Sequence, residues 1–311
     1  MLSALVLSLA AAIGLYAAGP PKPGRILRVP LNVQAPSGEA PPQLRLSDLR
    51  AVMEGGREPK LLSLKTPKDD LMLLLVTDLT GDLMLADAAR SALTNQLQEL
   101  PPNVWVGMMR AQDGLHVETD PSAARQPLIQ ALERLQVSGK AGLLDTVEST
   151  ISLADRIAQK AAVRVAILYV TDSDVRNYRE DFTNPVINSS DSRDLSRRFP
   201  EGLIREKTAR LAENLAATET PVFIVHLQYS AERLNEAYQG GLGALAIATG
   251  GSSWFCRTPS DIPGSIASAV SAARSQYVLR VQLPEKAPKS VHLMVTAGDH
   301  AVTARSRFAL P

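Results

Sequence analysis

The 311-residue chain is 45% hydrophobic, which is enough to bury a core and excludes a disordered protein. Its 33 lysine and arginine residues are balanced by 32 aspartate and glutamate residues, so the net charge at pH 7 is only +1. Proteins that condense on a phosphate backbone carry a basic excess, and nucleic acid is therefore not an expected partner. The single cysteine, Cys256, excludes an internal disulfide, so stability must come from packing.

The chain begins with an apolar segment. Residues 2–19 are rich in alanine and leucine, and the first charged side chain is Lys22. This pattern is typical of a secretory signal peptide and predicts export to the periplasm, the cell envelope or the medium. Because no lysine or arginine precedes the run, two alternatives stay open: an uncleaved membrane anchor and a buried N-terminal helix. Residues 1–19 are assigned to a signal peptide or anchor, and a membrane is contacted only through this segment if it is uncleaved.

A linker and a β segment follow. Residues 20–24 contain three prolines, which lack amide donors and fix φ, so they are predicted to connect and not to fold. Residues 26–33 and 49–64 alternate between apolar and polar side chains, as half-buried strands do, and residues 54–57 supply a turn with two glycines. The prediction is an N-terminal β segment over residues 25–66.

The middle of the chain, residues 67–275, has a different period. Continuous apolar runs predict strands that are buried on both faces, as in a parallel sheet covered by helices. The runs are residues 71–76, 163–170 and 222–227, with a shorter one at 104–109. Helix-spaced apolar residues occur at 83–97, 122–135, 143–159, 204–217, 231–248 and 259–275. This order predicts an α/β fold, a doubly wound and mostly parallel sheet with helices on both faces.

The last segment returns to strand-like alternation. Residues 277–283, 290–296 and 301–308 alternate, with breaks at Pro284 and Gly298. Each terminal β segment alone has too few strands to be stable in water. We therefore expect the C-terminal β segment, residues 276–311, to pack with the N-terminal strands as accessory β structure.

Acidic loops follow two of the predicted strands. Asp78, Thr80 and Asp82 come after the strand at 71–76, and Asp172 comes after the strand at 163–170. In an open parallel sheet, ligands bind at the carboxyl ends of the strands. Carboxylate and hydroxyl oxygens are the ligands that Mg²⁺ or Ca²⁺ prefers, so these four residues are the candidate metal ligands. The alternative is that the aspartates are solvated loop residues, with Asp82 capping the helix that follows it.

At these loops the chain resembles the von Willebrand factor A-type domain, and most closely the exported bacterial VWFA-related domain proteins. The first loop of that family reads Asp-x-Ser-x-Ser, and Asp78, Thr80 and Asp82 stand at its positions. Ala141 stands where the family has a threonine before a helix start, whereas Asp172 keeps the aspartate of the family's Thr-Asp-Gly turn. Further similarity lies in residues 52–56, 245–251 and 277–279.

The resemblance implies a noncatalytic protein-binding module of the cell envelope, serving adhesion or assembly, with a degenerate metal-dependent site. In the family, a carboxylate of the partner completes the metal's octahedron. Here Ala141 offers no oxygen and Asp82 adds a negative charge, which would repel such a carboxylate. The partner is expected to be a protein whose identity the sequence does not give.

The segment at residues 173–200 is long and polar. If recognition uses the carboxyl ends of the strands, Asp174, Arg176 and Arg179 are the expected partner contacts. A solvated insertion is an equal alternative, because exposed loop tips commonly have no role in binding.

Two other classes of function stay open. One is a structural or assembly component that binds without metal, which the missing threonine favours. The other is a hydrolase that uses metal-activated water, which would need a base close to Asp172. Cys256 and His226 could be a nucleophile and its base, although a lone cysteine in an apolar strand is more often a packed thiol. An enzyme is therefore not expected.

Overall fold

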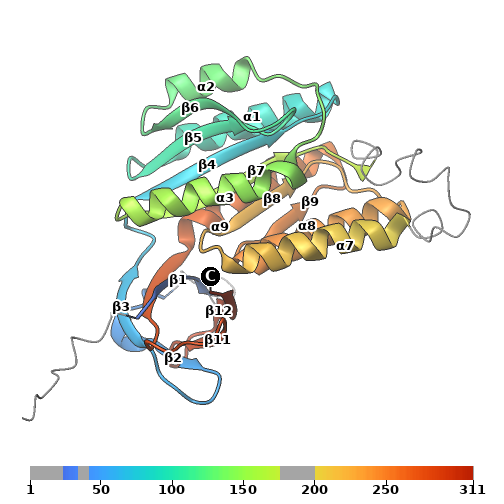
Figure 1. Cartoon of the computed structure of the whole chain (residues 1–311). Coiled ribbons are helices and arrows are strands. Elements are labelled where there is room, and N and C mark those ends of the chain that lie inside the picture. The colour runs from blue at the N-terminus through green and yellow to red at the C-terminus, as the bar shows by residue number, and fades with distance from the viewer. Residues whose placement is uncertain (1–23, 34–41, 176–199, 311) are drawn as a thin grey trace, which may run out of the picture.

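The computed structural model describes residues 24–33, 42–175 and 200–310, which form an α/β domain with a smaller β unit packed against one end (Figure 1). The predicted signal or anchor at residues 1–19 lies outside the described residues. Within the described part, no helix has the length and hydropathy needed to cross a membrane. The domain boundaries inferred from the sequence stay a prediction.

The α/β domain is built on a six-stranded sheet in the order β6-β5-β4-β7-β8-β9. Its strands are β4 (Leu71–Asp78), β5 (Val104–Arg110), β6 (His116–Ser122), β7 (Arg164–Thr171), β8 (Val222–His226) and β9 (Ser253–Phe255). Only β6 runs antiparallel to its neighbour. Counted along the chain within this sheet, the order is 3-2-1-4-5-6, which is the doubly wound topology. The predicted fold class is confirmed.

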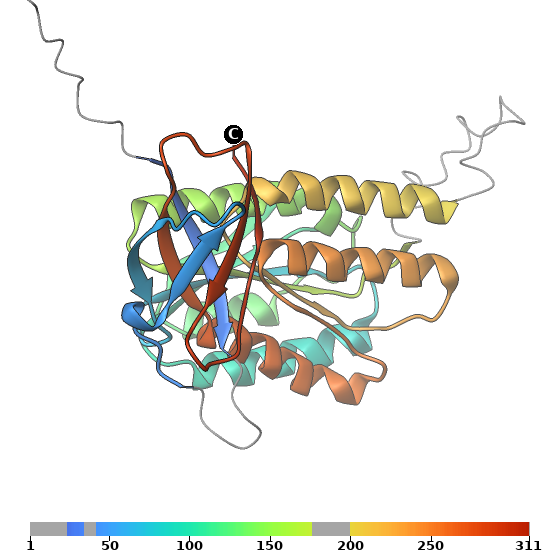
Figure 2. The same cartoon turned by 90° about the horizontal axis from the view of Figure 1, so that it is seen from below.

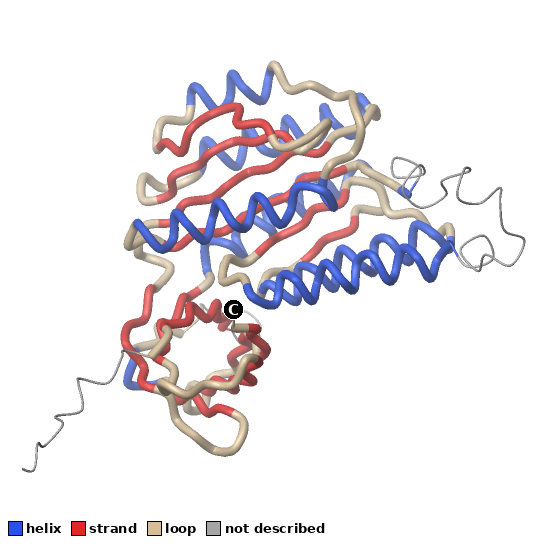
Figure 3. Tube along the Cα trace, in the orientation of Figure 1, coloured by secondary structure: helices blue, strands red, loops and turns tan. Residues whose placement is uncertain are grey.

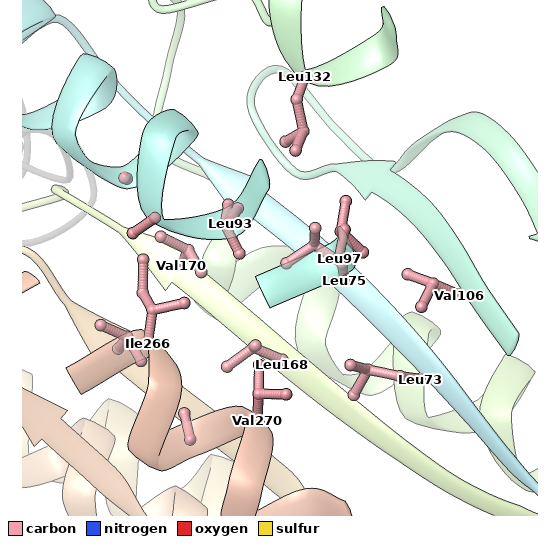
Figure 4. Close-up of a cluster of buried hydrophobic side chains, with 14 of the residues drawn as sticks. Leu73, Leu75, Leu93, Leu97, Val106, Leu132, Leu168, Val170, Ile266 and Val270 are labelled. Carbon is pink, nitrogen blue, oxygen red and sulfur yellow. The ribbon is translucent and has the colours of Figure 1, made fainter. Parts of the chain in front are cut away.

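Helices cover both faces of this sheet. One face carries α1 (Leu83–Glu99), α2 (Gln126–Glu133) and α9 (Ile262–Ser275), and the other carries α3 (Leu143–Lys160), α7 (Pro200–Asn214) and α8 (Arg233–Thr249). Leu73 and Leu75 of β4 belong to the first core, the same buried cluster as Leu93 and Leu97 of α1 (Figure 4). The intervening Leu74 packs in the second core. Burial on both faces explains why the strand sequences do not alternate.

Strand β6 was not predicted. The sequence suggested a helix from residue 122, but Ser122 ends β6, and α2 begins only at Gln126. Charged side chains and Pro121 hide the strand in the sequence. Both are tolerated here because β6 lies at the edge of the sheet, where one row of backbone groups needs no partner strand.

The β unit joins strands from both ends of the chain. Its sheets have the orders β12-β1-β10-β3 and β13-β11-β2. The strands are β1 (Ile26–Val33), β2 (Arg50–Met53), β3 (Lys60–Lys65), β10 (Tyr277–Gln282), β11 (Ser290–Thr296), β12 (Val302–Ala304) and β13 (Arg307–Ala309). They surround a separate apolar core and form a ring of strands in Figure 3. From below, the unit lies across one end of the α/β domain (Figure 2).

A buried arginine stands where the chain passes between the two parts. Arg164, the first residue of β7, donates to the carbonyls of Arg274 and Gln276 at 2.8 and 2.9 Å, where α9 leads into β10. It also donates to the carbonyls of Pro67 and Asp69 at 3.0 and 2.9 Å, where β3 leads into β4. Burial lowers its pKa to about 10, so it stays charged at neutral pH. One guanidinium group thus holds both connections between the α/β domain and the β unit.

Arginines of the β unit reach the ends of helices in the α/β domain. Arg305 donates to the carbonyls of Leu215, Ala216 and Thr218, at the end of the helical segment that α7 begins. Arg28 on β1 donates to the carbonyl of Ala158 in the last turn of α3. The last carbonyls of a helix lack partners within it and carry partial negative charge, so guanidinium groups suit them.

Candidate functional site

The candidate site lies between β4 and β7, at the side of the sheet where the parallel strands end, which we call the carboxyl edge. The chain leaves β4 for α1 on one face of the sheet and leaves β7 for α7 on the other. Such a switch point opens a crevice between the two departing loops. Asp78 and Thr171, the last residues of β4 and β7, are register partners, and Asp172 follows directly.

Asp78 is fully buried and caps a helix. Its Oδ1 accepts the amide N–H of Gly142 at 2.9 Å, and its Oδ2 accepts that of Leu143 at 3.1 Å and the Thr171 hydroxyl at 3.3 Å. These amides belong to the start of α3, where free N–H groups and the helix dipole favour an anion. Burial raises the pKa of Asp78 to about 6, although the amides and the hydroxyl act in the opposite direction.

Gly142 is needed for this approach. A Cβ atom at this position would lie 1.8 Å from the carbonyl oxygen of Ala111, so a residue with a side chain would push α3 away from the sheet. The glycine therefore lets the first amides of α3 reach Asp78.

Asp172, 9% exposed, holds the loop that follows β4. Its Oδ1 accepts the Thr80 amide at 2.6 Å and the Thr80 hydroxyl at 2.9 Å, and its Oδ2 accepts the Asp82 amide at 3.3 Å. The loop after β7 thus supplies the carboxylate that fixes the loop after β4. The hydroxyl of Thr80 serves here as a donor.

Asp82 caps α1, as the alternative interpretation of the sequence predicts. Its Oδ1 accepts the amides of Met84 and Leu85 at 3.0 and 3.1 Å. An aspartate at this position satisfies two of the four amides that a helix N-terminus leaves free.

The structure therefore brings the four predicted ligands together, but it engages them in hydrogen bonds. Both oxygens of Asp78 and of Asp172 accept N–H groups, and Ala141 supplies no oxygen. Across residues 24–33, 42–175 and 200–310, no three histidine, cysteine, aspartate or glutamate side chains are grouped to hold a metal ion. Arranged in this way, the donor set does not fit the shell of Mg²⁺ or Ca²⁺.

Behind the carboxylates lies a row of buried hydroxyls. Thr171 Oγ1 lies 2.6 Å from Ser173 Oγ, which lies 2.9 Å from the Tyr238 hydroxyl. A hydroxyl has one proton to donate. Because Thr171 donates to Asp78, Ser173 donates to Thr171, and Tyr238 donates to Ser173. The row ties the carboxyl edge to α8.

The surroundings of His226 and Cys256 suit side chains that pack in the fold. The Nε2 atom of His226 lies 2.7 Å from the carbonyl of Ser173, and its Nδ1 accepts the amide of Gln228 at 3.3 Å. Burial lowers the pKa of this imidazole and raises that of the Cys256 thiol. A neutral histidine with both nitrogens engaged and a protonated thiol favour packing over a nucleophile and its base.

Two exposed apolar side chains at this edge were not singled out from the sequence. Leu83 and Met84, in the first turn of α1, are 66% and 65% exposed. The buried residues of α1 already form a complete stripe: Leu85, Ala86, Ala89, Ala92, Leu93 and Leu97. Leu83 and Met84 are surplus to that stripe, which is the signal that could have identified them. Of the predicted partner contacts, Asp174 is half-buried, and Arg176 and Arg179 lie outside the described residues.

Comparisons with known proteins give similarities of structure. No protein-family model matches the chain, and neither does any curated protein. Von Willebrand factor type A from Catenulispora acidiphila is 10% identical, with a TM-score of 0.43 over 81% of this chain and 73% of that one. BatB from Bacteroides thetaiotaomicron is 14% identical, with a TM-score of 0.40 over 66% and 98%. The vWF domain of the type V pili tip protein Mfa5 from Porphyromonas gingivalis is 10% identical, with a TM-score of 0.43 over 67% and 96%.

The von Willebrand factor A-type resemblance predicted from the sequence is confirmed as a likeness of fold. Identities and TM-scores this low carry no argument about what the chain binds.

Proposed function

We propose that this chain is a noncatalytic protein-binding module, serving adhesion or assembly at the cell envelope, and that its carboxyl edge binds without a metal. One contrast at that edge carries the proposal. The acidic groups are engaged by the fold's own amides, whereas the adjacent Leu83 and Met84 are exposed. Exposed apolar side chains beside a topological switch point support contact with a protein. The envelope location rests on the signal-like sequence of residues 2–19.

The metal-dependent form of the same function is the second candidate, because the family resemblance implies it. It would require Asp78 and Asp172 to exchange their amide partners for a cation. The amides of Gly142, Leu143 and Thr80 would then lose buried acceptors, which is costly in a site this poorly hydrated. The hydrolase alternative is less favoured, because the histidine beside Asp172 is neutral and has both nitrogens engaged.

Cation titration separates the two forms. Calorimetry and thermal unfolding of the purified protein with Mg²⁺, Ca²⁺ and Mn²⁺ should show no saturable heat and no increase in Tm. Saturable binding that Asp78→Ala abolishes would establish the metal-dependent form instead.

Binding itself is tested by retaining envelope proteins of the source organism on the immobilised chain, with EDTA or with Mg²⁺. We expect the same proteins to be retained in both buffers, and retention to fall when Leu83 and Met84 are both replaced by serine. Ile247→Ser is the matched control, because Ile247 is 71% exposed near the far end of α8. Retention no greater than on a plain support would show that the proposed function is wrong.

A further inference from the structure

The partner's chemistry follows from the surface around the first turn of α1, which we call the α1 edge and define as Asp82, Leu83, Met84 and the adjacent Asp172. We propose that the α1 edge binds a protein segment in which an apolar side chain is flanked by lysine or arginine. This inference rests on the proposed function and names the class of partner for the same site.

The apolar part of the α1 edge is unused by the fold. Leu85 and Ala86, the next two residues of α1, are buried in the core, whereas Leu83 and Met84 project from the first turn with about two thirds of their surface exposed. Their backbone is fixed, because Asp82 caps this turn. A rigid turn that presents a leucine and a flexible methionine suits an apolar side chain of a partner, since little order has to be imposed on binding.

The charge of the α1 edge selects what surrounds that apolar side chain. From Asp78 to Ala89 every charged residue is acidic, and the first base, Arg90, is paired with Asp87. Asp172 contacts the same loop through the Asp82 amide. The bases at the same edge of the sheet, among the described residues, include Lys140 in the loop before α3, Arg110 at the end of β5, which is paired with Glu118, and Arg257 after β9, which lies over the Tyr229 ring.

Two alternative occupants fit less well. A second copy of the chain docking through the same edge would bring these carboxylates together, which opposes association. A partner carboxylate would meet the same repulsion. A segment with basic residues beside its apolar anchor is attracted by the same charges.

Synthetic peptides test the inference with defined probes. Three fluorescent peptides share one scaffold: leucine flanked by arginines, leucine flanked by glutamates, and serine flanked by arginines. Anisotropy titrations use the purified protein in EDTA, at low and at physiological salt. We expect the arginine–leucine peptide to bind at least roughly tenfold more tightly than either of the others.

Variants of the protein locate the binding. Leu83→Ser combined with Met84→Ser should weaken binding of the arginine–leucine peptide by about tenfold or more, and Ile247→Ser should leave it unchanged. Asp82→Asn retains the helix cap but removes a charge, so it should weaken binding mainly at low salt. Circular dichroism of each variant checks that the fold is kept.

The outcomes separate this inference from the function beneath it. If envelope proteins are retained but the serine variant retains them equally well, the protein binds them through another surface, and the assignment of binding to the α1 edge is wrong. If retention depends on Leu83 and Met84 but the glutamate-flanked peptide binds as well as the arginine-flanked one, the inferred partner chemistry is wrong. If the wild-type chain retains nothing, the proposed function itself fails.

Discussion

Buried charges stand at both ends of the central sheet, and they have opposite signs. At the carboxyl edge Asp78 and Asp172 accept backbone N–H groups, whereas at the opposite end Arg164 and Arg305 donate to backbone carbonyls. All of these charged side chains bind backbone groups, and most of those groups lie at helix termini. In a doubly wound sheet the helices begin at the carboxyl edge and end at the other, so anions suit one end and cations the other.

The two ends differ in what covers them. The arginine end is covered by the β unit, and its cations hold the two parts together. The carboxyl edge has no such cover among the described elements (Figure 1), and its anions hold loops and helix starts of the α/β domain itself. Buried charges bound to backbone groups therefore connect the two parts of the protein at one end of the sheet and make the exposed surface rigid at the other.

The largest effect is expected at the arginine end. Arg164→Met removes the donors of four carbonyls that lie where the chain passes between the two parts. We expect the free energy of unfolding to fall by about 3 kcal/mol, since several buried acceptors lose a charged donor. Denaturant unfolding measures this. Arg57→Met, at an exposed position of the β unit, is the control, and an equal effect of the two changes would show that the joint does not depend on Arg164.

A pH profile tests the anionic end. The pKa of Asp78 is raised from 3.8 to about 6 in the folded protein, so the stability it contributes is fully present below 3.8 and is lost as the pH rises through 6. The advantage in unfolding free energy of the wild type over Asp78→Asn should therefore shrink by roughly 3 kcal/mol between about pH 4 and about pH 8. Urea unfolding of both proteins across this range gives the difference. If the difference in unfolding free energy did not change with pH, the pKa of Asp78 would not be raised in the folded protein.

The smallest effect concerns the helix cap. Asp82→Ala removes the acceptor of the Met84 and Leu85 amides and should lower the free energy of unfolding by about 1 kcal/mol. Asp82→Asn retains a capping oxygen and should be close to wild type. If the alanine and asparagine variants were equally destabilised, the charge and not the cap would be the important property of Asp82.

Much of this fold could be predicted because the relevant signals are local. The apolar run of β4 and the helix-spaced residues of α1 specify their elements, and Asp82 caps the helix that starts one residue later. The partners of Asp78 could not be predicted in this way, because Gly142 lies 64 residues further along the chain. An aspartate at a strand end looks the same in the sequence whether its oxygens meet amides or a cation. The exposure of Leu83 and Met84 has one signal in the sequence, which is that both residues fall outside the apolar stripe of α1.

The position of Arg164 has a mechanical consequence. Both covalent connections to the β unit meet at this residue, beside the amino ends of β4 and β7, the two middle strands of the sheet. A tensile load applied to the β unit would therefore enter the α/β domain through β4 and α9, and the hydrogen bonds of Arg164 would pass part of it to β7. Those strands are hydrogen-bonded on both sides, so their bonds are loaded together in shear and not opened one at a time from an edge.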